Sequence, residues 1–328
     1  LYNVVNKNFY GDKIPIENTK TIKKLMKAHL VDFQNLNEPE DVLLNNGYAY
    51  VPCRDGNNVA VVDISKPESP SIVASIQHPD MLDVFGVSIE DNYFYAVSMS
   101  NQKLIIVDIS KPEKPELIST LTIGGKGDFN KNYDSYHTRL RKVTVKNGYA
   151  YVTHSNEGRL YIVDVKDARN PKILSHLETT DGGFAVFIDG DYAYLGGCGP
   201  GDSVIVADIS DKNNPKILKR IYDEKKLSCT CDFSKKGAYL FATGYGDDTF
   251  LTFDISSPEN IKLVSVFTHP NMIGPGRLVI KSDEAFVINS KNDSMCSIDI
   301  SNPKSPKINY FVSDRLIDRT YGICLLYT

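Results

Sequence analysis

The fold is decided by the stretch Leu104-Ile-Ile-Val-Asp-Ile-Ser-Lys-Pro-Glu-Lys-Pro115, which recurs six times in recognisable form. Its aspartate appears as Asp63, Asp108, Asp164, Asp208, Asp254 and Asp299. Four of the five steps between these aspartates are 44 to 46 residues long, and the step from Asp108 to Asp164 is 56 residues long. A period in this range indicates an array of one repeated supersecondary unit.

Each unit reads as four short strands. In the second copy, 84–89 and 104–109 are apolar runs, 93–97 is aromatic and β-branched, and 116–122 alternates apolar and polar residues. Polar turns and a Pro pair separate these runs, and no helical period connects them. Four strands per unit, repeated around an axis, are the plan of a β-propeller blade.

At these motifs the chain resembles the LVIVD-repeat family of β-propellers. The resemblance lies in Val61–Ser65, Ile106–Ser110, Ile162–Lys166, Val206–Ser210, Thr252–Ser256 and Ser297–Ser301, and it extends over about residues 40–312. It implies a propeller fold and, from many members of the family, an extracytoplasmic or surface setting. It implies no particular activity, because propellers include binding modules and enzymes alike.

We therefore expect an all-β protein with a single propeller domain over residues 1–328. The repeats span approximately 40–77, 83–123, 140–177, 183–221, 228–267 and 276–312. The preferred arrangement has seven blades, the last built from residues 1–31 and 319–328, because such closure removes exposed sheet edges. The alternative is six blades with a helical or coiled N-terminal extension.

The repeated aspartate favours a structural interpretation. One Asp at the end of a strand, followed by Ser and Pro, is typical of a side chain that stabilises a turn. Six equivalent carboxylates around a ring lie too far apart to act together.

Composition narrows the class of partner. The net charge of −4 comes from interspersed Lys and Glu without a basic stripe, which argues against nucleic acid. No apolar stretch reaches the roughly 18 residues of a membrane span, so we expect no membrane insertion. The cysteines are interpreted mostly as small buried hydrophobes, and Cys229-Thr-Cys231 as buried thiols rather than metal ligands. Free thiols favour the cytosol, which leaves the compartment open.

The candidate site is the propeller face formed by the loops between blades and the loops between second and third strands. The segment 124–141 accounts for the long step and concentrates aromatic, imidazole and guanidinium groups suited to anions or carbohydrates. A tolerated surface insertion is the alternative for this segment. The starts of the inner strands place Asp41, Asp83, Arg141, Cys229, Arg277 and Arg319 near a channel mouth. The predicted binding residues are Tyr133, Tyr136, His137, Arg139, Arg141, His154, Arg277 and Arg319.

No catalytic motif is recognisable, so the leading hypothesis is a non-catalytic module that binds a protein or glycan, without metal or cofactor. The second hypothesis is a small-molecule enzyme at the channel mouth, with His137 or His154 as base and Arg141, Arg277 or Arg319 holding an anionic substrate. The third is a structural or surface-assembly component.

Overall fold

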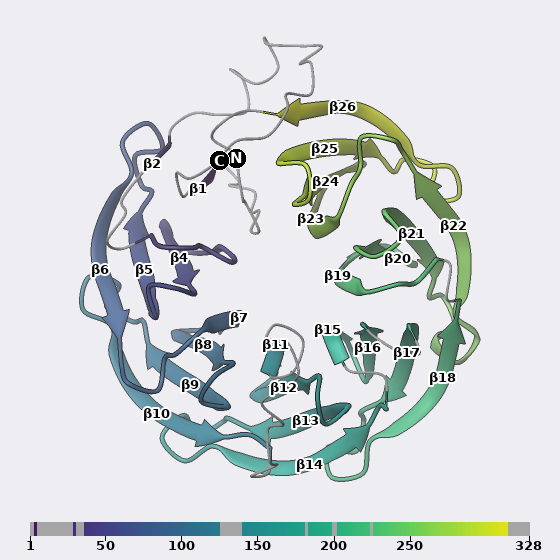
Figure 1. The fold of residues 1–328 in the computed structure, drawn as a ribbon. Coiled ribbons are helices and arrows are strands. Elements are labelled where there is room, and N and C mark those ends of the chain that lie inside the picture. Colours follow the sequence, from purple (N-terminus) through teal and green to yellow (C-terminus); the bar gives the residue numbers. More distant parts are fainter. Residues whose placement is uncertain are drawn as a thin grey trace, which may run out of the picture.

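Six four-stranded antiparallel sheets are arranged around a common axis in the computed structural model (Figure 1). The structure describes residues 36–124, 140–180, 183–198, 202–223 and 226–313, together with the backbone of residues 3–4 and 29–30. Within every sheet, strands that follow one another in sequence are neighbours, so each sheet is a meander. The prediction of an all-β propeller with four-stranded blades is confirmed.

The blades are numbered I to VI along the chain, each from its innermost to its outermost strand. They are blade I, β3–β6 (Leu43–Asn45, Tyr48–Cys53, Asn58–Asp63, Ser71–Gln77); blade II, β7–β10 (Val84–Glu90, Tyr93–Ser98, Lys103–Asp108, Glu116–Thr122); blade III, β11–β14 (Leu140–Lys146, Tyr149–His154, Arg159–Asp164, Lys172–Glu178); blade IV, β15–β18 (Gly183–Asp189, Tyr192–Gly197, Ser203–Asp208, Lys216–Tyr222); blade V, β19–β22 (Thr230–Lys236, Tyr239–Gly244, Thr249–Asp254, Lys262–Thr268); and blade VI, β23–β26 (Pro275–Lys281, Glu284–Asn289, Ser294–Asp299, Lys307–Ser313). Among the described residues the one helix is the 3-10 turn η1, Pro258–Asn260. No helix of these residues is long and apolar enough to cross a membrane.

The terminal strands do not form the expected seventh blade. β1 (Asn3–Val4) and β2 (His29–Leu30) pair in parallel as a separate two-stranded sheet between blades I and VI (Figure 1). Neighbouring strands within a blade are antiparallel and are joined by short turns. A parallel pair needs a longer connection, and residues 5–28 provide one between β1 and β2. The preferred seven-bladed arrangement is therefore wrong for the described strands, and the six-bladed alternative matches them. Residues 319–328 and most of 1–31 lie outside the described residues.

The hydrophobic core lies between neighbouring blades. For example, Tyr50 of blade I packs in one cluster with Phe94 of blade II, and Tyr194 of blade IV packs with Phe253 of blade V. Large side chains of this kind are fully buried because each blade covers the face of the next. The alternation of Tyr and Ala in the second strands therefore serves packing between stacked sheets.

The repeated aspartates stabilise turns, as the sequence predicts. The Oδ1 of each accepts a hydrogen bond from the backbone N–H two residues later, at 2.8 to 3.0 Å. These bonds, from backbone N–H or side-chain hydroxyl groups, lower the pKa of Asp63, Asp108, Asp208, Asp254 and Asp299. The six carboxylates hold the exit of each third strand and are not a shared site.

Two sets of loops form the mouth face of the ring, which comprises the loops entering each inner strand and the loops joining second to third strands. Backbone hydrogen bonds tie them together within a blade, as between Met99 N and Asp83 O at 3.1 Å and between Ser290 N and Gly274 O at 2.9 Å. The opposite, turn face comprises the turns between first and second strands and those between third and fourth strands.

Candidate functional site: the channel mouth

A β-bulge lies near the first residue of each inner strand from β7 to β23. The pairing register shifts between Val84 and Val87, Leu140 and Val143, Gly183 and Ala185, Thr230 and Asp232, and Pro275 and Leu278. A bulge turns side chains out of the regular ladder and is common beside functional sites. The bulges carry Phe85, Arg141, Lys142, Phe184, Cys231 and Arg277, so chemically diverse side chains gather where the strands begin.

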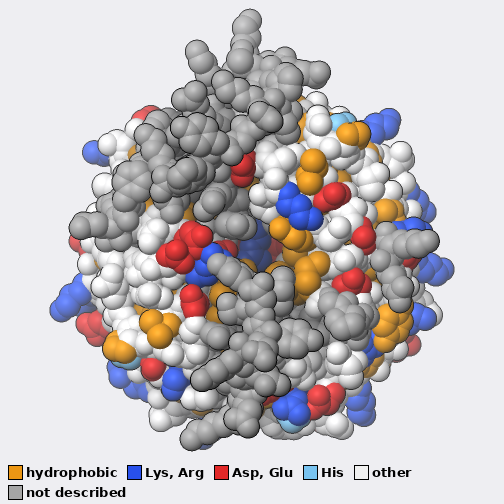
Figure 2. Space-filling model, in the orientation of Figure 1, with side chains coloured by type: hydrophobic (Ala, Val, Ile, Leu, Met, Phe, Trp, Pro, Cys, Tyr) orange, Lys and Arg blue, Asp and Glu red, His pale blue; other side chains and the backbone are white. Residues whose placement is uncertain are grey.

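Four charged side chains from four blades meet on the ring axis. Lys142 Nζ of blade III lies 3.5 Å from Asp41 Oδ2 and 4.0 Å from Asp232 Oδ1. Arg277 of blade VI lies 3.2 Å from Asp41 Oδ2 through Nη2 and 3.8 Å from Asp232 Oδ1 through Nη1. Because Lys142 contacts acids of blades I and V at once, these residues form an axial ion network that crosses the channel. Figure 2 shows the central hollow, with cationic side chains deep inside it.

Charge pairing dominates the environment of Arg277. Burial is the largest single effect and lowers the pKa of the Arg277 guanidinium, but Asp41 and Asp232, with smaller contributions from Glu40 and Cys231, together outweigh it and raise the pKa above its usual value. Asp232 also accepts a hydrogen bond from Leu278 N through Oδ2, at 3.1 Å. The axial ion network is therefore an ordered layer of paired charges at the inner end of the channel mouth.

A second cluster of charges lies beside this layer in blade I. Arg54 forms ion pairs with Glu38 and, at 2.7 Å between Nη1 and Oε1, with Glu40. The Glu40 pair is close without being aligned as a hydrogen bond. Glu40 is only 2% exposed, and burial raises the pKa of its carboxyl group to about 7 despite Arg54, Arg277 and Arg141 nearby. Glu40 therefore changes protonation near neutrality.

Arg141 differs from the other cations of the channel. Its side chain is flanked by two aromatic rings, with Cζ 5.2 Å from the centre of Phe85 and 4.8 Å from that of Phe184. Its residue is 3% exposed, and its Nε and Nη2 are buried with no hydrogen-bond partner within the described ranges. Burial lowers the pKa of Arg141 to about 10, which still leaves the group charged at neutral pH.

His154 belongs to a different cluster. Its Nδ1 accepts a hydrogen bond from Glu157 N at 3.3 Å, and its Nε2 lies 3.9 Å from Glu157 Oε1. A side chain at Gly124 would collide with His154 Cδ2, so the ring faces the loop leaving blade II. Burial lowers the pKa of His154, which is 1% exposed. The imidazole is therefore neutral at neutral pH and packs between blades rather than in the axial ion network.

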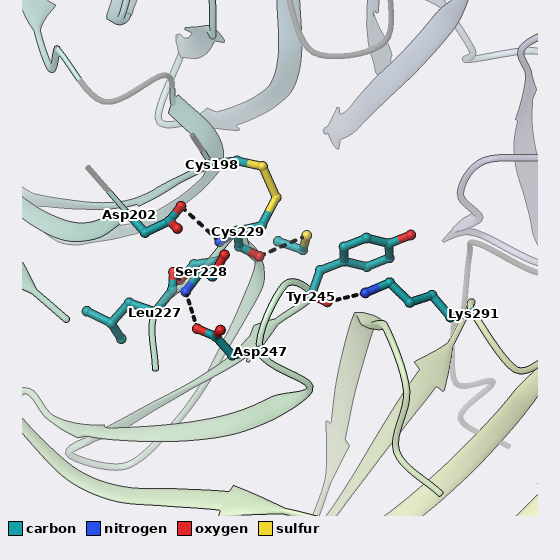
Figure 3. Close-up of a disulfide and its surroundings, with 10 residues drawn as sticks. Cys198, Asp202, Leu227, Ser228, Cys229, Tyr245, Asp247 and Lys291 are labelled. Atoms are coloured by element: carbon teal, nitrogen blue, oxygen red, sulfur yellow. Dashed lines mark hydrogen bonds between the residues drawn. A yellow bond between two sulfur atoms is a disulfide. The ribbon is translucent and has the colours of Figure 1, made fainter. Parts of the chain in front are cut away.

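The cysteines depart from the sequence interpretation. Cys229 forms a disulfide with Cys198, which links the mouth-face loops of blades IV and V (Figure 3). Cys231 keeps a free thiol that donates to Cys229 O at 3.2 Å, and burial raises its pKa to about 12. The interpretation of Cys229 and Cys231 as two buried thiols is wrong for Cys229. Its partner lies 31 residues away on a neighbouring blade, and no spacing rule indicates such a pair.

The predicted site residues fall into three groups. Arg141 and Arg277 both lie at the channel mouth, and His154 lies between blades II and III. Tyr133, Tyr136, His137, Arg139 and Arg319 are outside the described residues. Asp83, also expected near the channel mouth, accepts a hydrogen bond from Ser100, while Arg277 pairs with Asp41 and Asp232.

Sequence reasoning did not select Phe85, Lys142, Phe184, Asp232 or Glu40. Four of these residues could be found from their position within the repeat. Phe85 and Phe184 are the second residues of their inner strands, and Lys142 and Asp232 are the third residues of theirs. Glu40 precedes the first inner strand, in a segment whose Pro39 bridges to Cys53.

A cavity of about 750 Å³ opens below the axial ion network, toward the turn face. Lys142 and Asp232 contribute to its lining, together with apolar side chains such as Leu43, Phe187 and Phe233. Arg141 does not line it, since Arg141 precedes Lys142 and lies nearer the mouth face. Across the described ranges, no three His, Cys, Asp or Glu side chains come close enough to hold a metal ion.

Comparison with known proteins agrees with the fold. Residues 38–77, 83–122, 140–179 and 184–224 match the family model of the LVIVD repeat. No curated protein matches the chain. Similar solved structures include a putative 6-phosphogluconolactonase from Bacteroides fragilis NCTC 9343, with 11% identity, 88% of this chain and 86% of that chain covered, and a TM-score of 0.73.

Two further structures illustrate the functional range of this fold. The periplasmic gluconolactonase PpgL of Pseudomonas aeruginosa is 12% identical, with 86% of each chain covered and a TM-score of 0.70. A chain of a nidogen/laminin complex is 13% identical, with 86% of this chain and 95% of that chain covered and a TM-score of 0.56. At such low identity the likeness shows the fold alone. The four matched segments, the repeated Asp turns and the six four-stranded blades agree, and the chain belongs to the LVIVD-repeat family of β-propellers.

Proposed function

We propose that the protein is a non-catalytic binding module that presents its mouth face to a protein or glycan. The observation that carries this proposal is cross-bracing of the mouth-face loops between blades. Asn57 Oδ1 of blade I accepts from Asp83 N at 2.9 Å, and Asp248 Oδ1 of blade V accepts from Gly274 N at 2.7 Å. Between blades IV and V, Asp202 Oδ1 accepts from Cys229 N at 3.1 Å, beside the disulfide (Figure 3).

These contacts favour recognition by a fixed surface. The residues that enter the inner strands are held in left-handed backbone conformations, with φ of 52° at Asp83 and 55° at Cys229. The axial ion network supports the same face from below. Surfaces ordered before binding lose less conformational entropy when a partner docks, so such a face suits a binding module. The Cys198–Cys229 disulfide also supports a place in an oxidising compartment, where surface partners occur.

A second candidate is an enzyme at the same channel mouth. It is favoured by Glu40, because a carboxyl group with a pKa of about 7 can exchange protons near neutrality. Two of the similar structures are described as lactonases, which makes sugar lactones the substrates to test. Of the two bases suggested by the sequence, His137 lies outside the described residues, and His154 packs against Glu157 and Tyr161.

The test of the binding module uses two matched tyrosines. Tyr245 lies in a mouth-face loop, where Lys291 Nζ sits 4.3 Å from its ring centre. Tyr149 begins β12 at the turn face, where Lys166 Nζ lies at the same distance, 4.3 Å, from its ring centre. Purified protein is screened on glycan arrays and against extracellular proteins, and the affinity for any ligand found is then measured for each variant. Tyr245→Ala is expected to weaken binding about tenfold or more, and Tyr149→Ala to leave it unchanged.

The same preparation is assayed for hydrolysis of gluconolactone and 6-phosphogluconolactone. If the unmodified chain hydrolyses a lactone, the Glu40→Gln variant does not, and neither screen finds a partner, the enzyme would replace the binding module as the proposed function.

A further inference from the structure

Arg141 presents an unsatisfied hydrogen-bonding edge. A guanidinium has five N–H donors, and two of the donor atoms of Arg141, Nε and Nη2, are buried without a partner in the described part of the chain. Leaving a buried charged donor unpaired is costly, more so than for a neutral group. The cost is removed if an acceptor arrives with a ligand.

The two flanking rings restrict how a ligand can approach. Phe85 of blade II and Phe184 of blade IV place their ring centres 5.2 and 4.8 Å from Arg141 Cζ, so the blades on either side of Arg141 each bring a ring against the guanidinium and narrow the approach to it. Nε and Nη2 lie on the same side of the planar group and together form the fork that accepts a carboxylate in two parallel hydrogen bonds. A planar carboxylate fits this edge between two rings better than a tetrahedral phosphate, which projects oxygens out of the plane.

The nearby carboxylates are already engaged. Asp41 and Asp232 pair with Lys142 and Arg277 in the axial ion network. Glu40 pairs with Arg54 at 2.7 Å. The charge of Arg141 is felt at Glu40 without a direct contact between the two side chains. Arg141 is thus the cation of the channel mouth that its described neighbours leave without an ion pair.

We propose that Arg141 is the anchor for a carboxylate group of the ligand, held edge-on between Phe85 and Phe184 at the mouth of the channel. The inference deepens the proposed function and relies on it only for the carboxylate being part of a larger partner. The ligand class chosen is an acidic glycan, because a uronic acid joins the carboxylate that the Arg141 fork accepts to the glycan class of the proposed function.

The test uses small carboxylates as probes. Titration calorimetry with glucuronate and with acetate is expected to give dissociation constants in the millimolar range for the unmodified chain. Inorganic phosphate and methyl glucoside are expected to bind at least about tenfold more weakly. Phosphate can offer two acceptors to the fork, but its other oxygens project out of the plane toward the flanking rings, and methyl glucoside carries no charge. Arg141→Lys keeps the charge but loses the fork, so it is expected to weaken glucuronate binding about tenfold or more. Arg169→Gln, which removes an exposed guanidinium of blade III, is the matched control and is expected to bind normally.

A second readout separates a ligand anchor from a structural residue. Arg141→Met removes an unpaired buried charge and keeps an apolar stem between the rings, so its melting temperature without ligand is expected to equal or exceed that of the unmodified chain. A clear fall in melting temperature, with no carboxylate binding to the unmodified chain, would show that Arg141 is paired within the protein and would overturn the proposal. Equal binding of phosphate and glucuronate would overturn the choice of carboxylate.

Failure of the inference is distinguishable from failure of the proposed function. A macromolecular partner whose binding is insensitive to Arg141→Lys leaves the function standing and removes the carboxylate anchor. Binding of glucuronate and acetate without any glycan or protein partner keeps the anchor and removes the binding module.

Discussion

Glu40 and Asp41 are adjacent carboxylates with different environments. Asp41 contacts two cations of the axial ion network at 3.2 and 3.5 Å. Glu40 is more deeply buried and has one close cation, Arg54. Desolvation therefore dominates at Glu40 and raises its pKa, in spite of the positive charges around it. At Glu40 burial outweighs its ion pair, and the pKa of its carboxyl group rises to about 7.

Glu40 makes the stability of the fold depend on pH. Its folded pKa of about 7 lies above the usual 4.5, so the folded state keeps a proton that the unfolded chain releases. The stabilisation is complete below pH 4.5 and is lost as pH rises through 7. It amounts to something on the order of 3 kcal/mol. Glu40→Gln resembles the protonated acid at every pH, so the unmodified chain should lose stability relative to this variant between pH 5 and pH 8.

Thermal or urea unfolding across that range measures the difference. The exposed Glu113→Gln variant is the control, and its difference from the unmodified chain should not change with pH in this way. A constant difference for Glu40→Gln would contradict the assignment.

At the scale of elements, the bulges of the inner strands determine which side chains reach the channel. A regular strand alternates its side chains between two faces, so Arg141 and Lys142 would point in opposite directions. The bulge between Leu140 and Val143 breaks this alternation, so the side chains of Arg141 and Lys142 both reach the channel. The bulges also bring the backbones of neighbouring inner strands close together, as at Gly86, where a Cβ would lie 2.7 Å from Lys142 Cα.

Gly86→Ala is therefore expected to be strongly destabilising. The added methyl group would collide with the backbone of Arg141 and Lys142, which belong to a buried strand and cannot move aside cheaply. Overpacking of this kind costs about 1–3 kcal/mol. Gly276→Ala is the matched control, because its Cβ would meet nothing closer than Ile288 O at 3.9 Å. We expect that variant to stay within about 0.5 kcal/mol of the unmodified chain in denaturant unfolding. Equal losses at the two glycines would refute the close approach of β7 and β11.

At the scale of the whole molecule, most of the architecture follows from the sequence and part of the site does not. The spacing of Asp63 through Asp299 predicts the blades, and their turn role is confirmed by the hydrogen bonds to the residues two places on. Arg141 and Arg277 could be placed at the channel because they begin inner strands. Lys142 and Asp232 hold the same third place in their strands as Arg277 and could be found in the same way, but the bulges that direct these side chains toward the axis are not predicted by the repeat. The parallel pairing of β1 with β2 lies outside the repeats, so the repeat pattern cannot predict it.

The disulfide between blades IV and V also acts on the whole ring. Cys198 and Cys229 are 31 residues apart, and a crosslink over that separation restricts the unfolded chain by about 4 kcal/mol. Replacing both cysteines by Ser should lower the unfolding free energy by a similar amount. A reducing agent should shift the melting temperature of the unmodified chain and leave that of the double variant unchanged. If the reducing agent lowered both melting temperatures equally, the bond would not be the cause.

The axial ion network couples four positions that lie far apart in the sequence. Each of Asp41, Lys142, Asp232 and Arg277 contacts two of the others, so replacing one alone leaves a charge in the channel without its full complement. Such a change is tolerated only when a second position changes with it. Among related sequences, positions 41, 142, 232 and 277 should therefore vary in concert, with a lost acid accompanied by a lost base, so that four blades share one evolutionary constraint.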